Sequence, residues 1–267
     1  MKDEKDSKLN YLLQNLTQEP KFSSFDPHPS SFRILLWDID GTLVIAPRGG
    51  AYKDYFAPAL ERVYGSSGVL RERVKVSGMT DLQIAYEALK PEGVTVEQIY
   101  AKTNEFCRVL GEEIERVCGG EKGRFVALPG ARELLQATHE HPLLINSLLT
   151  GNVQPAARFK LGFVGLDRFF DFSIGAFGNE SHERKDLPAI AARHASEKFD
   201  YEFLPSQFIV LGDTPNDIAC AHYFGAKAVA VATGRNHPPE TLLPHQPDFL
   251  LENLTDTAKV LQILETI

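Results

Sequence analysis

Five polar residues follow apolar segments of this sequence at three separate places. Asp38 and Asp40 lie in "FRILLWDIDGTLV", Thr150 lies in "LLTGN", and Asp213 and Asp217 lie in "LGDTPND". Continuous apolar runs are typical of strands buried on both faces of a parallel sheet, and ligands bind outside the carboxyl ends of such strands. Carboxylates that converge there repel one another and need a cation. The pattern therefore predicts an acidic, cation-binding site.

Each of these segments also has a simpler interpretation when it is taken alone. Asp38 and Asp40 could form a turn that leaves a strand, because Asp-Gly is a common turn pair. Thr150 could be an ordinary helix N-cap. Asp213 and Asp217 could be a cap and a first-turn acid that favour the helix dipole. The occurrence of all three at the ends of apolar runs favours one shared site.

Apolar runs alternate with helical patterns from Phe32 onward, which predicts a doubly wound α/β core with a mainly parallel sheet. The predicted strands are 32–38, 142–149, 170–176, 208–212, 227–232 and 248–251. The predicted helices of the core are 131–140, 154–161, 186–198, 217–224 and 255–265.

The sequence also predicts three parts along the chain. Residues 1–31 form an N-terminal extension, with one short amphipathic helix indicated by the spacing of four leucines, Leu9, Leu12, Leu13 and Leu16. Residues 46–124 lack buried strand patterns and contain helical patterns at 52–64, 81–89 and 96–117, so they form an inserted helical domain. The core then consists of residues 32–45 and 125–267.

Composition narrows the class of protein. The chain has 267 residues, of which 43% are hydrophobic, and a formal net charge of -8. It can bury a large core, and the acidic balance without Lys or Arg clusters argues against a nucleic-acid partner. Three unpaired cysteines indicate a reducing, cytoplasmic location. No apolar run reaches ~18 residues, so we expect no membrane partner.

The three quoted motifs, in this order on alternating strands, resemble motifs one, two and four of the haloacid dehalogenase-like (HAD-like) hydrolase superfamily. The resemblance covers roughly residues 32–253, and the DxDGT signature is highly specific. It is closest to the phosphoglycolate-phosphatase-like members. It implies a Rossmann-like core with an inserted helical C1 cap domain.

The resemblance also implies roles for the acids. Asp38 would attack phosphorus and form an aspartyl-phosphate, and Asp40 would act as general acid and then as general base. The dehalogenases of the superfamily lack an acid at the second position, so Asp40 favours phosphoryl chemistry. The cofactor would be Mg²⁺, held by the Asp38 side chain, the Asp40 backbone carbonyl, Asp213 and Asp217.

Phosphate would be bound at two further places. The Thr150 hydroxyl and the Gly151 N–H lie at a helix start, where donors suit an anion. The superfamily usually has a lysine ahead of the helix after strand three, and this sequence offers Arg184 or Lys185 in "ESHERKDLPAIA". The spacing matches variants with arginine in this place, so Arg184 is the first choice. Both residues could instead be solvated at a helix N-terminus.

Substrate choice is expected to lie in the cap. The segment "KVSGMTD", with Thr80 and Asp81, resembles a substrate-facing cap loop, and Arg48 and Tyr52 lie near the hinge. All four could equally be surface loop residues.

These features predict a Mg²⁺-dependent phosphomonoester hydrolase that acts on a small phosphorylated metabolite. The alternative within the superfamily is a phosphomutase, which would use the same two aspartates and return the phosphoryl group to a sugar. The alternative outside enzymes is a non-catalytic binding protein on the same fold.

Overall fold

The core of the protein is a sheet of five parallel strands. The computed structural model describes residues 28–46, 51–70, 76–120 and 124–267. The sheet has the strand order β4-β1-β5-β6-β7, with every neighbouring pair parallel. Its strands are β1 (Arg33–Trp37), β4 (Leu144–Leu148), β5 (Phe208–Gly212), β6 (Lys227–Val231) and β7 (Phe249–Leu251).

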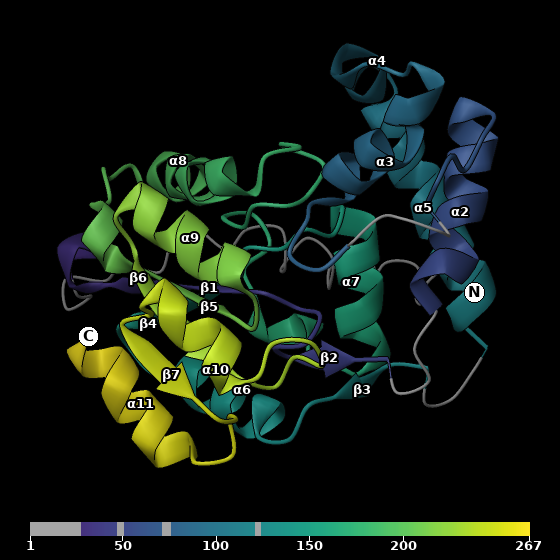
Figure 1. The fold of residues 1–267 in the computed structure, drawn as a ribbon. Coiled ribbons are helices and arrows are strands. Elements are labelled where there is room, and N and C mark those ends of the chain that lie inside the picture. The colour runs from purple at the N-terminus through teal and green to yellow at the C-terminus, as the bar shows by residue number, and fades with distance from the viewer. Residues whose placement is uncertain (1–27, 47–50, 71–75, 121–123) are drawn as a thin grey trace, which may run out of the picture.

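Helices cover both faces of this sheet, so alternate residues of each strand enter different apolar clusters (Figure 1). Leu35 and Trp37 of β1 pack on the side of α6 (Ala131–Glu140) and α11 (Thr257–Thr266). Ile34 and Leu36 pack on the side of α8 (Leu187–Phe199) and α9 (Pro215–Phe224). This double burial is the reason that the strand sequences are continuously apolar. The remaining core helices are α7 (Gln154–Phe163) and α10 (Pro239–Leu242).

A block of helices is inserted between β1 and β4. It contains α2 (Ala51–Tyr64), α3 (Asp81–Leu89), α4 (Val96–Ala101) and α5 (Thr103–Cys118). A short antiparallel pair, β2 (Val44–Ile45) and β3 (Val126–Ala127), lies at the two ends of the block. These helices stand beside the sheet, and α5 packs on α7 (Figure 1). The predicted fold class, a Rossmann-like α/β core with an inserted helical cap, is confirmed, and the boundaries at 46 and 124 stay predictions.

The predicted strand at 170–176 is wrong. The segment meets β4 only at its two ends, where the Asp171 N–H donates to the Asn146 carbonyl and Ala176 pairs with Leu149. Between these points the Asp171 carboxylate accepts from the Ser173 N–H at 3.0 Å and bends the chain. An aspartate side chain that accepts a hydrogen bond from the backbone N–H two residues later favours a turn over strand pairing, even in an apolar segment.

Two other differences concern the inserted block. The predicted helix 96–117 is divided at Lys102 into α4 and α5. The β2–β3 pair was not predicted, because two residues are too few to give a periodic pattern. The other predicted helices of the described chain form within a few residues of their expected ends.

The proposed N-terminal extension lies mostly outside the described residues, and so does its predicted helix. The described end begins with a short 3₁₀ turn, Pro29–Ser31. The Gln207 side-chain amide donates to the carbonyls of Pro29 and Phe32 at 3.2 Å each, which fastens this end to the core. In the described residues, no helix is both long and apolar enough to cross a membrane.

A network of hydrogen bonds among buried polar side chains stabilises β1. The Trp37 indole N–H donates to Asn146 Oδ1 at 3.0 Å, and the Asn146 amide donates to Thr138 Oγ1 at 2.9 Å. All three side chains are buried. A buried donor that loses its acceptor incurs its full desolvation cost. The network therefore fixes the strand that ends at Asp38.

We expect Asn146→Ala to lower the free energy of unfolding by about 1–3 kcal/mol, because it leaves the Trp37 N–H without an acceptor in an apolar surround. Urea titration followed by Trp37 fluorescence would measure the change. Gln262→Ala, an exposed position on α11, is the control and should change stability by less than about 0.5 kcal/mol. Equal stabilities for Asn146→Ala and wild type would contradict this role.

Candidate active site

The first two aspartates lie where β1 ends next to its neighbours β4 and β5. Asp38 still pairs with β5 through its N–H, which donates to the Leu211 carbonyl at 2.8 Å. Asp40 follows in a tight turn in which Gly41 has φ +93° and its N–H donates to the Val44 carbonyl at 2.8 Å. The Asp38 side chain is buried, whereas the Asp40 side chain is 48% exposed. The two carboxylates therefore have different environments despite their spacing.

Asp213 and Asp217 lie on the adjacent strand end and helix start. Asp213 follows β5, and Asp217 is in the first turn of α9. Asp217 Oδ2 accepts from both the N–H and the hydroxyl of Thr214, whose side chain in turn accepts from the Asp217 N–H. This capping box leaves Asp217 Oδ1 to face the site.

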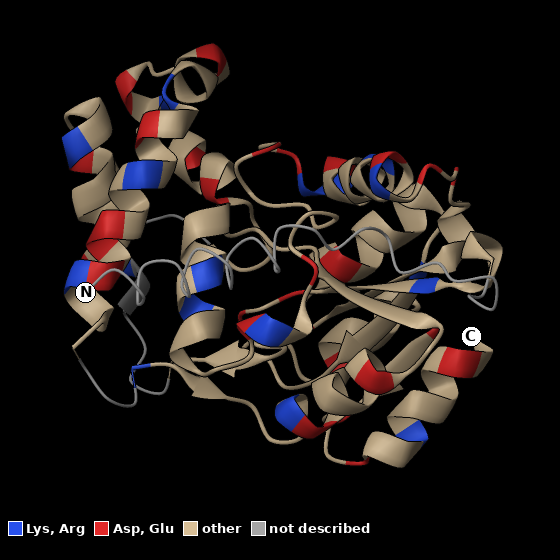
Figure 2. Cartoon of the chain, turned by 180° about the vertical axis from the view of Figure 1, so that it is seen from behind, with Lys and Arg blue, Asp and Glu red and all other residues tan. Residues whose placement is uncertain are grey.

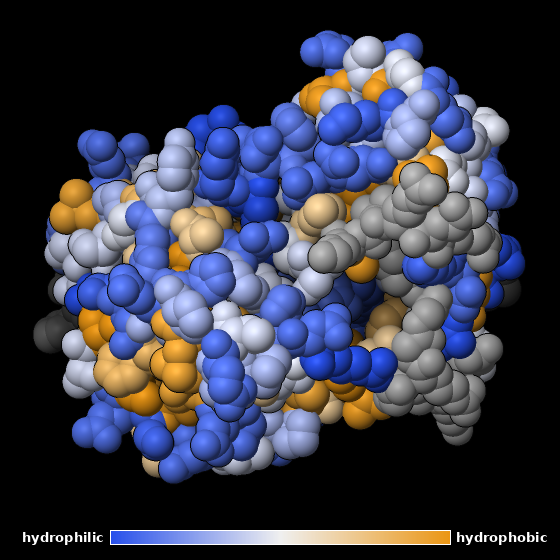
Figure 3. All heavy atoms as spheres, in the orientation of Figure 1, coloured by the Kyte–Doolittle hydropathy of each residue, from blue (hydrophilic) through white to orange (hydrophobic). Residues whose placement is uncertain are grey.

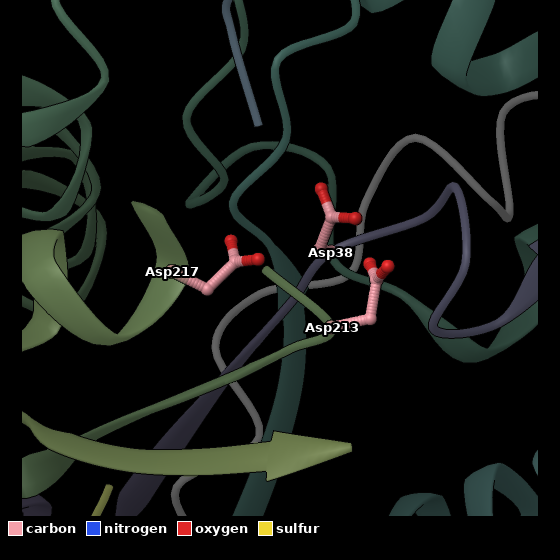
Figure 4. Close-up of side chains that lie close together, drawn as sticks. All are labelled: Asp38, Asp213 and Asp217. Atoms are coloured by element: carbon pink, nitrogen blue, oxygen red, sulfur yellow. The ribbon is translucent and has the colours of Figure 1, made fainter. Parts of the chain in front are cut away.

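Asp38, Asp213 and Asp217 form a buried acidic group, in which one oxygen of each lies within 4.8 Å of the others. Figure 4 shows the three carboxylates gathered in one space from two strand ends and α9. Burial, together with repulsion from Asp217, raises the pKa of Asp38 to about 7. Burial, with repulsion from Asp38, also raises the pKa of Asp213. Such an arrangement is costly without a cation.

The donor set fits a hard divalent cation, which takes carboxylate and carbonyl oxygens. The backbone leaves room for the Asp213 carboxylate, since a side-chain carbon at Gly41 or Gly234 would overlap it. Asp213 Oδ1 is further held by the Thr42 hydroxyl at 3.3 Å. The site is therefore shaped around three carboxylates that are oriented by their neighbours.

Arg184 supplies the positive charge inside this group. Its Nη2 donates to Asp38 Oδ1 at 2.9 Å and also to Asp217 Oδ1. Burial alone would lower the pKa of Arg184, but the charges of Asp217 and Asp38 raise it above its usual value. Arg184 is 7% exposed, and its guanidinium stays charged because arginine does not lose its proton in proteins.

Lys185, the alternative for the same role, points elsewhere. Its side chain is half exposed, lies 3.7 Å from Glu183 Oε2, and its ammonium lies over the Tyr223 ring. It does not line the cavity that contains Asp38. The geometry therefore favours Arg184 over Lys185 next to the nucleophile candidate.

Thr150 and Gly151 lie at the end of β4, as the sequence predicts. The Thr150 side chain is fully buried, and its Oγ1 accepts from the N–H and the side-chain amide of Asn152. Gly151 lines the cavity, and a side-chain carbon there would overlap the Met79 carbonyl. Only a glycine admits the inserted block this close to the strand end.

Asn152 and Lys160 are site residues that the sequence analysis missed. Lys160 Nζ donates to Asp40 Oδ2 at 2.6 Å and to Asn152 Oδ1 at 2.7 Å, and the Asn152 amide donates to Asp40 Oδ2 at 2.8 Å. Lys160 is 2% exposed. The only signal for Lys160 in the sequence was its position beside Leu161 on the apolar side of α7. A lysine in such a position normally extends its ammonium group to solvent.

One cavity of about 280 Å³ lies between the sheet edge and the inserted block, and its lining includes Asp38, Asp40, Gly151, Asn152, Lys160, Arg184 and Asp213. Figure 3 shows the surface hollowed at this boundary. The segment 76–79 crosses it: the Ser77 hydroxyl lies 2.8 Å from His237 Nε2, and the Asn216 amide donates to the Gly78 carbonyl at 2.9 Å. Away from the cavity, the Lys and Arg of the described chain are interspersed with Asp and Glu (Figure 2).

The four predicted cap residues have different outcomes. Thr80 is fully buried and caps α3, and its hydroxyl donates to the His182 carbonyl at 3.1 Å. Asp81 lines the cavity, but its Oδ2 accepts from the Val153 N–H at 2.8 Å. Arg48 lies outside the described residues, as does the Tyr52 side chain. Thr80 and Asp81 thus join the inserted block to the core.

Several known proteins are similar to this chain in sequence. A family model described as HAD-hydrolase-like matches residues 185–257. The phosphoglycolate phosphatase of Vibrio vulnificus (strain YJ016) is 23% identical over 233 residues, which are 86% of this chain and 96% of that protein. Pyrophosphatase PpaX of Anoxybacillus flavithermus is 25% identical over 237 residues, again 86% of this chain and 96% of that protein.

Solved structures share the fold. A predicted phosphoglycolate phosphatase from Haemophilus somnus has a TM-score of 0.55 and 22% identity over 87% of this chain and 99% of its own. A candidate β-phosphoglucomutase from Thermotoga maritima has a TM-score of 0.53 and 20% identity over the same shares. The fold, the motifs and the relatives all resemble those of HAD-like hydrolases. In its sequence and its fold the chain is similar to phosphatases of the haloacid dehalogenase-like superfamily.

The buried Asp81 predicts a pH dependence of stability. Burial raises the pKa of Asp81 to about 7, only partly offset by its bond from the Val153 N–H and by Lys160. The folded chain keeps this proton between about pH 4 and 7, whereas the unfolded chain releases it near 3.8. Rising pH therefore favours unfolding through this group. Relative to wild type, Asp81→Asn should become more stable as pH rises from 4 to 8.

The measurement is urea unfolding of both proteins at several pH values. Asp256→Asn, an exposed helix cap that asparagine also satisfies, is the control and should follow wild type throughout. A constant difference between wild type and Asp81→Asn across this range would show that Asp81 ionises normally.

Proposed function

We propose that this chain is a Mg²⁺-dependent phosphomonoester hydrolase of a small phosphorylated metabolite, acting through an aspartyl-phosphate on Asp38. The observation that carries the proposal is the arrangement around Asp38: a buried carboxylate contacted by Arg184, grouped with Asp213 and Asp217, and open to a small cavity that Asp40 also lines. This set supplies a nucleophile, a proton donor and charge compensation in one place.

In the first step an Asp38 carboxylate oxygen forms a bond to phosphorus while the bond from phosphorus to the ester oxygen breaks. The leaving alkoxide takes a proton from the Asp40 carboxyl and departs as an alcohol. Asp38 then carries the phosphoryl group as an acyl phosphate, and Asp40 is a carboxylate. The half-exposed position of Asp40 at the cavity, outside the buried acidic group, suits a group that must change protonation.

In the second step Asp40 takes a proton from a water molecule as the water oxygen bonds to phosphorus. The bond between phosphorus and the Asp38 oxygen breaks, which releases phosphate and restores the Asp38 carboxylate. Asp40 is protonated again and ready for the next substrate.

Phosphate would be held by groups that line the cavity or lie next to it. Arg184 can share its donors between Asp38 and phosphoryl oxygens, and within the described residues the Gly151 N–H has no hydrogen-bond partner. The Thr150 hydroxyl, which only accepts bonds from Asn152, retains its hydrogen for donation. Mg²⁺, held by Asp38, the Asp40 carbonyl, Asp213 and Asp217, would neutralise charge on the transferring group.

The substrate class follows from the size of the site and from the relatives. A cavity of about 280 Å³ takes a small organic phosphate and excludes a polymer. The relatives are named phosphoglycolate phosphatase and pyrophosphatase, both of which denote small phosphorylated compounds. With residues 46–124 acting as the cap, the segment 76–79 would cover the substrate and exclude water during transfer. We place this activity in the cytoplasm.

We expect Asp38→Asn to abolish release of phosphate while the fold persists, because the amide keeps the shape but cannot attack phosphorus. Phosphate release from a panel of small phosphate esters with Mg²⁺ measures this. Acid quench of wild type during turnover should trap one acid-stable, base-labile phosphate on Asp38, found by peptide mapping.

The matched control is Asp256→Asn, the same substitution at an exposed helix cap, which should keep wild-type turnover. Turnover by Asp38→Asn, or phosphate trapped on another residue, would remove Asp38 as the nucleophile. A phosphomutase would instead label Asp38 but transfer the group to a second hydroxyl of the substrate with little free phosphate, and a binding protein would show neither.

We expect activity to end in excess EDTA and to return with Mg²⁺. Asp213→Asn should weaken Mg²⁺ binding more than Asp217→Asn, since Asp217 also has its capping partners and Arg184. Calorimetric titration with Mg²⁺ and the Mg²⁺-dependent rise in melting temperature measure binding without turnover. Full activity in EDTA, or unchanged Mg²⁺ affinity in Asp213→Asn, would contradict the metal site.

A further inference from the structure

Lys160 is a buried charge that the proposed chemistry does not use. It lies in the last turns of α7, is 2% exposed, and reaches from there to Asp40, 120 residues earlier in the chain. Burying an ammonium is costly, and a pair with a half-exposed carboxylate returns little stability. A position of this kind is better explained by its effect on Asp40 than by its contribution to folding.

Asn152 completes a closed set of hydrogen bonds with these two residues. Its Oδ1 accepts from Lys160 at 2.7 Å, while its amide donates to Asp40 Oδ2 and to Thr150 Oγ1, each at 2.8 Å. Every polar atom of this side-chain amide has a partner, so its orientation is determined. Lys160 and Asn152 therefore reach Asp40 Oδ2 as two fixed donors.

The two donors distinguish the two oxygens of the Asp40 carboxyl group. Oδ2 faces N–H groups from both Lys160 and Asn152, so a hydrogen on Oδ2 would meet other hydrogens. The acidic proton is left to Oδ1. The same contacts hold the Asp40 carboxylate apart from the buried acidic group of Asp38, Asp213 and Asp217.

We propose that Lys160, together with Asn152, is a positioning residue that fixes the Asp40 carboxyl so that Oδ1 gives its proton to the leaving oxygen. The inference rests on the proposed role of Asp40 as general acid. When the bond from phosphorus to the ester oxygen breaks, the proton moves from Asp40 Oδ1 to that oxygen, and Lys160 keeps its own protons throughout. A misplacement of about 1 Å in such a group costs up to ~10²-fold in rate.

Two substrates with different leaving groups distinguish this positioning role of Lys160 from a purely structural role. An alkoxide needs the proton from Asp40, whereas nitrophenolate leaves without one. In single-turnover formation of the aspartyl-phosphate, Lys160→Met should slow an alkyl phosphate by about 10–10²-fold. Nitrophenyl phosphate should change by less than about 3-fold, since its departure bypasses Asp40. Equal losses for the two substrates would overturn the inference.

A double substitution tests whether Lys160 acts through Asp40. Asp40→Asn alone should slow the alkyl phosphate by about 10²–10⁴-fold. Adding Lys160→Met to it should cause no further loss, because residues that act as one unit are not additive. A further loss equal to that of Lys160→Met alone would show that Lys160 acts elsewhere.

Controls keep the outcomes distinct. Lys198→Met, which removes an exposed lysine paired with Asp171, should match wild type on both substrates. If thermal unfolding shows that Lys160→Met does not fold, the same comparison in Lys160→Arg decides, since arginine keeps the charge but presents its donors to Asp40 and Asn152 in the different geometry of a planar guanidinium. If Asp40→Asn itself shows no dependence on leaving group, the proposed function fails rather than the role of Lys160.

Discussion

The structure depends on keeping three buried carboxylates within 4.8 Å of one another at the carboxyl edge of the sheet. Their mutual repulsion and loss of hydration would separate them in a less constrained chain. Rigid parts of the backbone prevent this: Asp38 and Asp213 end paired strands, and Asp217 is held by a capping box at the start of α9. Among the described residues, Arg184 is the cation that contacts two of them. The free energy of folding thus offsets the cost of holding the three carboxylates close together and away from water.

The sheet and its acids could be predicted because their cause is local. Strands covered by helices on both faces need continuous apolar sequence, and "FRILLW" and "QFIVLG" have it. The segment 170–176 has the same composition and fails as a strand, since the Asp171 carboxylate bonds to the backbone of Ser173 and turns the chain. Apolar content predicts burial there, and it was correct on burial for Phe170 and Phe172. It cannot predict which backbone groups will pair.

Lys160 and Asn152 could not be predicted, because their function depends on contacts between distant residues. A lysine in an amphipathic helix normally extends to solvent, and only the packing of α7 beneath the turn at Asp40 makes it an internal group. Arg184 and Lys185 are a second case in which the sequence could not predict the position of a side chain. They are adjacent and of one charge, yet one lies buried on Asp38 and the other over Tyr223 at the surface. The direction of the chain at that turn, rather than residue type, separates them.

Asp38 and Asp40 each contact a cationic side chain, and the two cations come from different elements of the fold. Arg184 contacts Asp38 from the turn before α8, whereas Lys160 contacts Asp40 from α7. The start of α7 is bonded to the inserted helices, since Asp81 of α3 accepts from the Val153 N–H and donates its own N–H to the Gly151 carbonyl. Farther along, Pro155 of α7 packs close to Gly111 of α5. The placement of Asp40 therefore depends on how the inserted helices sit on α7, while that of Asp38 depends on the sheet and on the turn that carries Arg184.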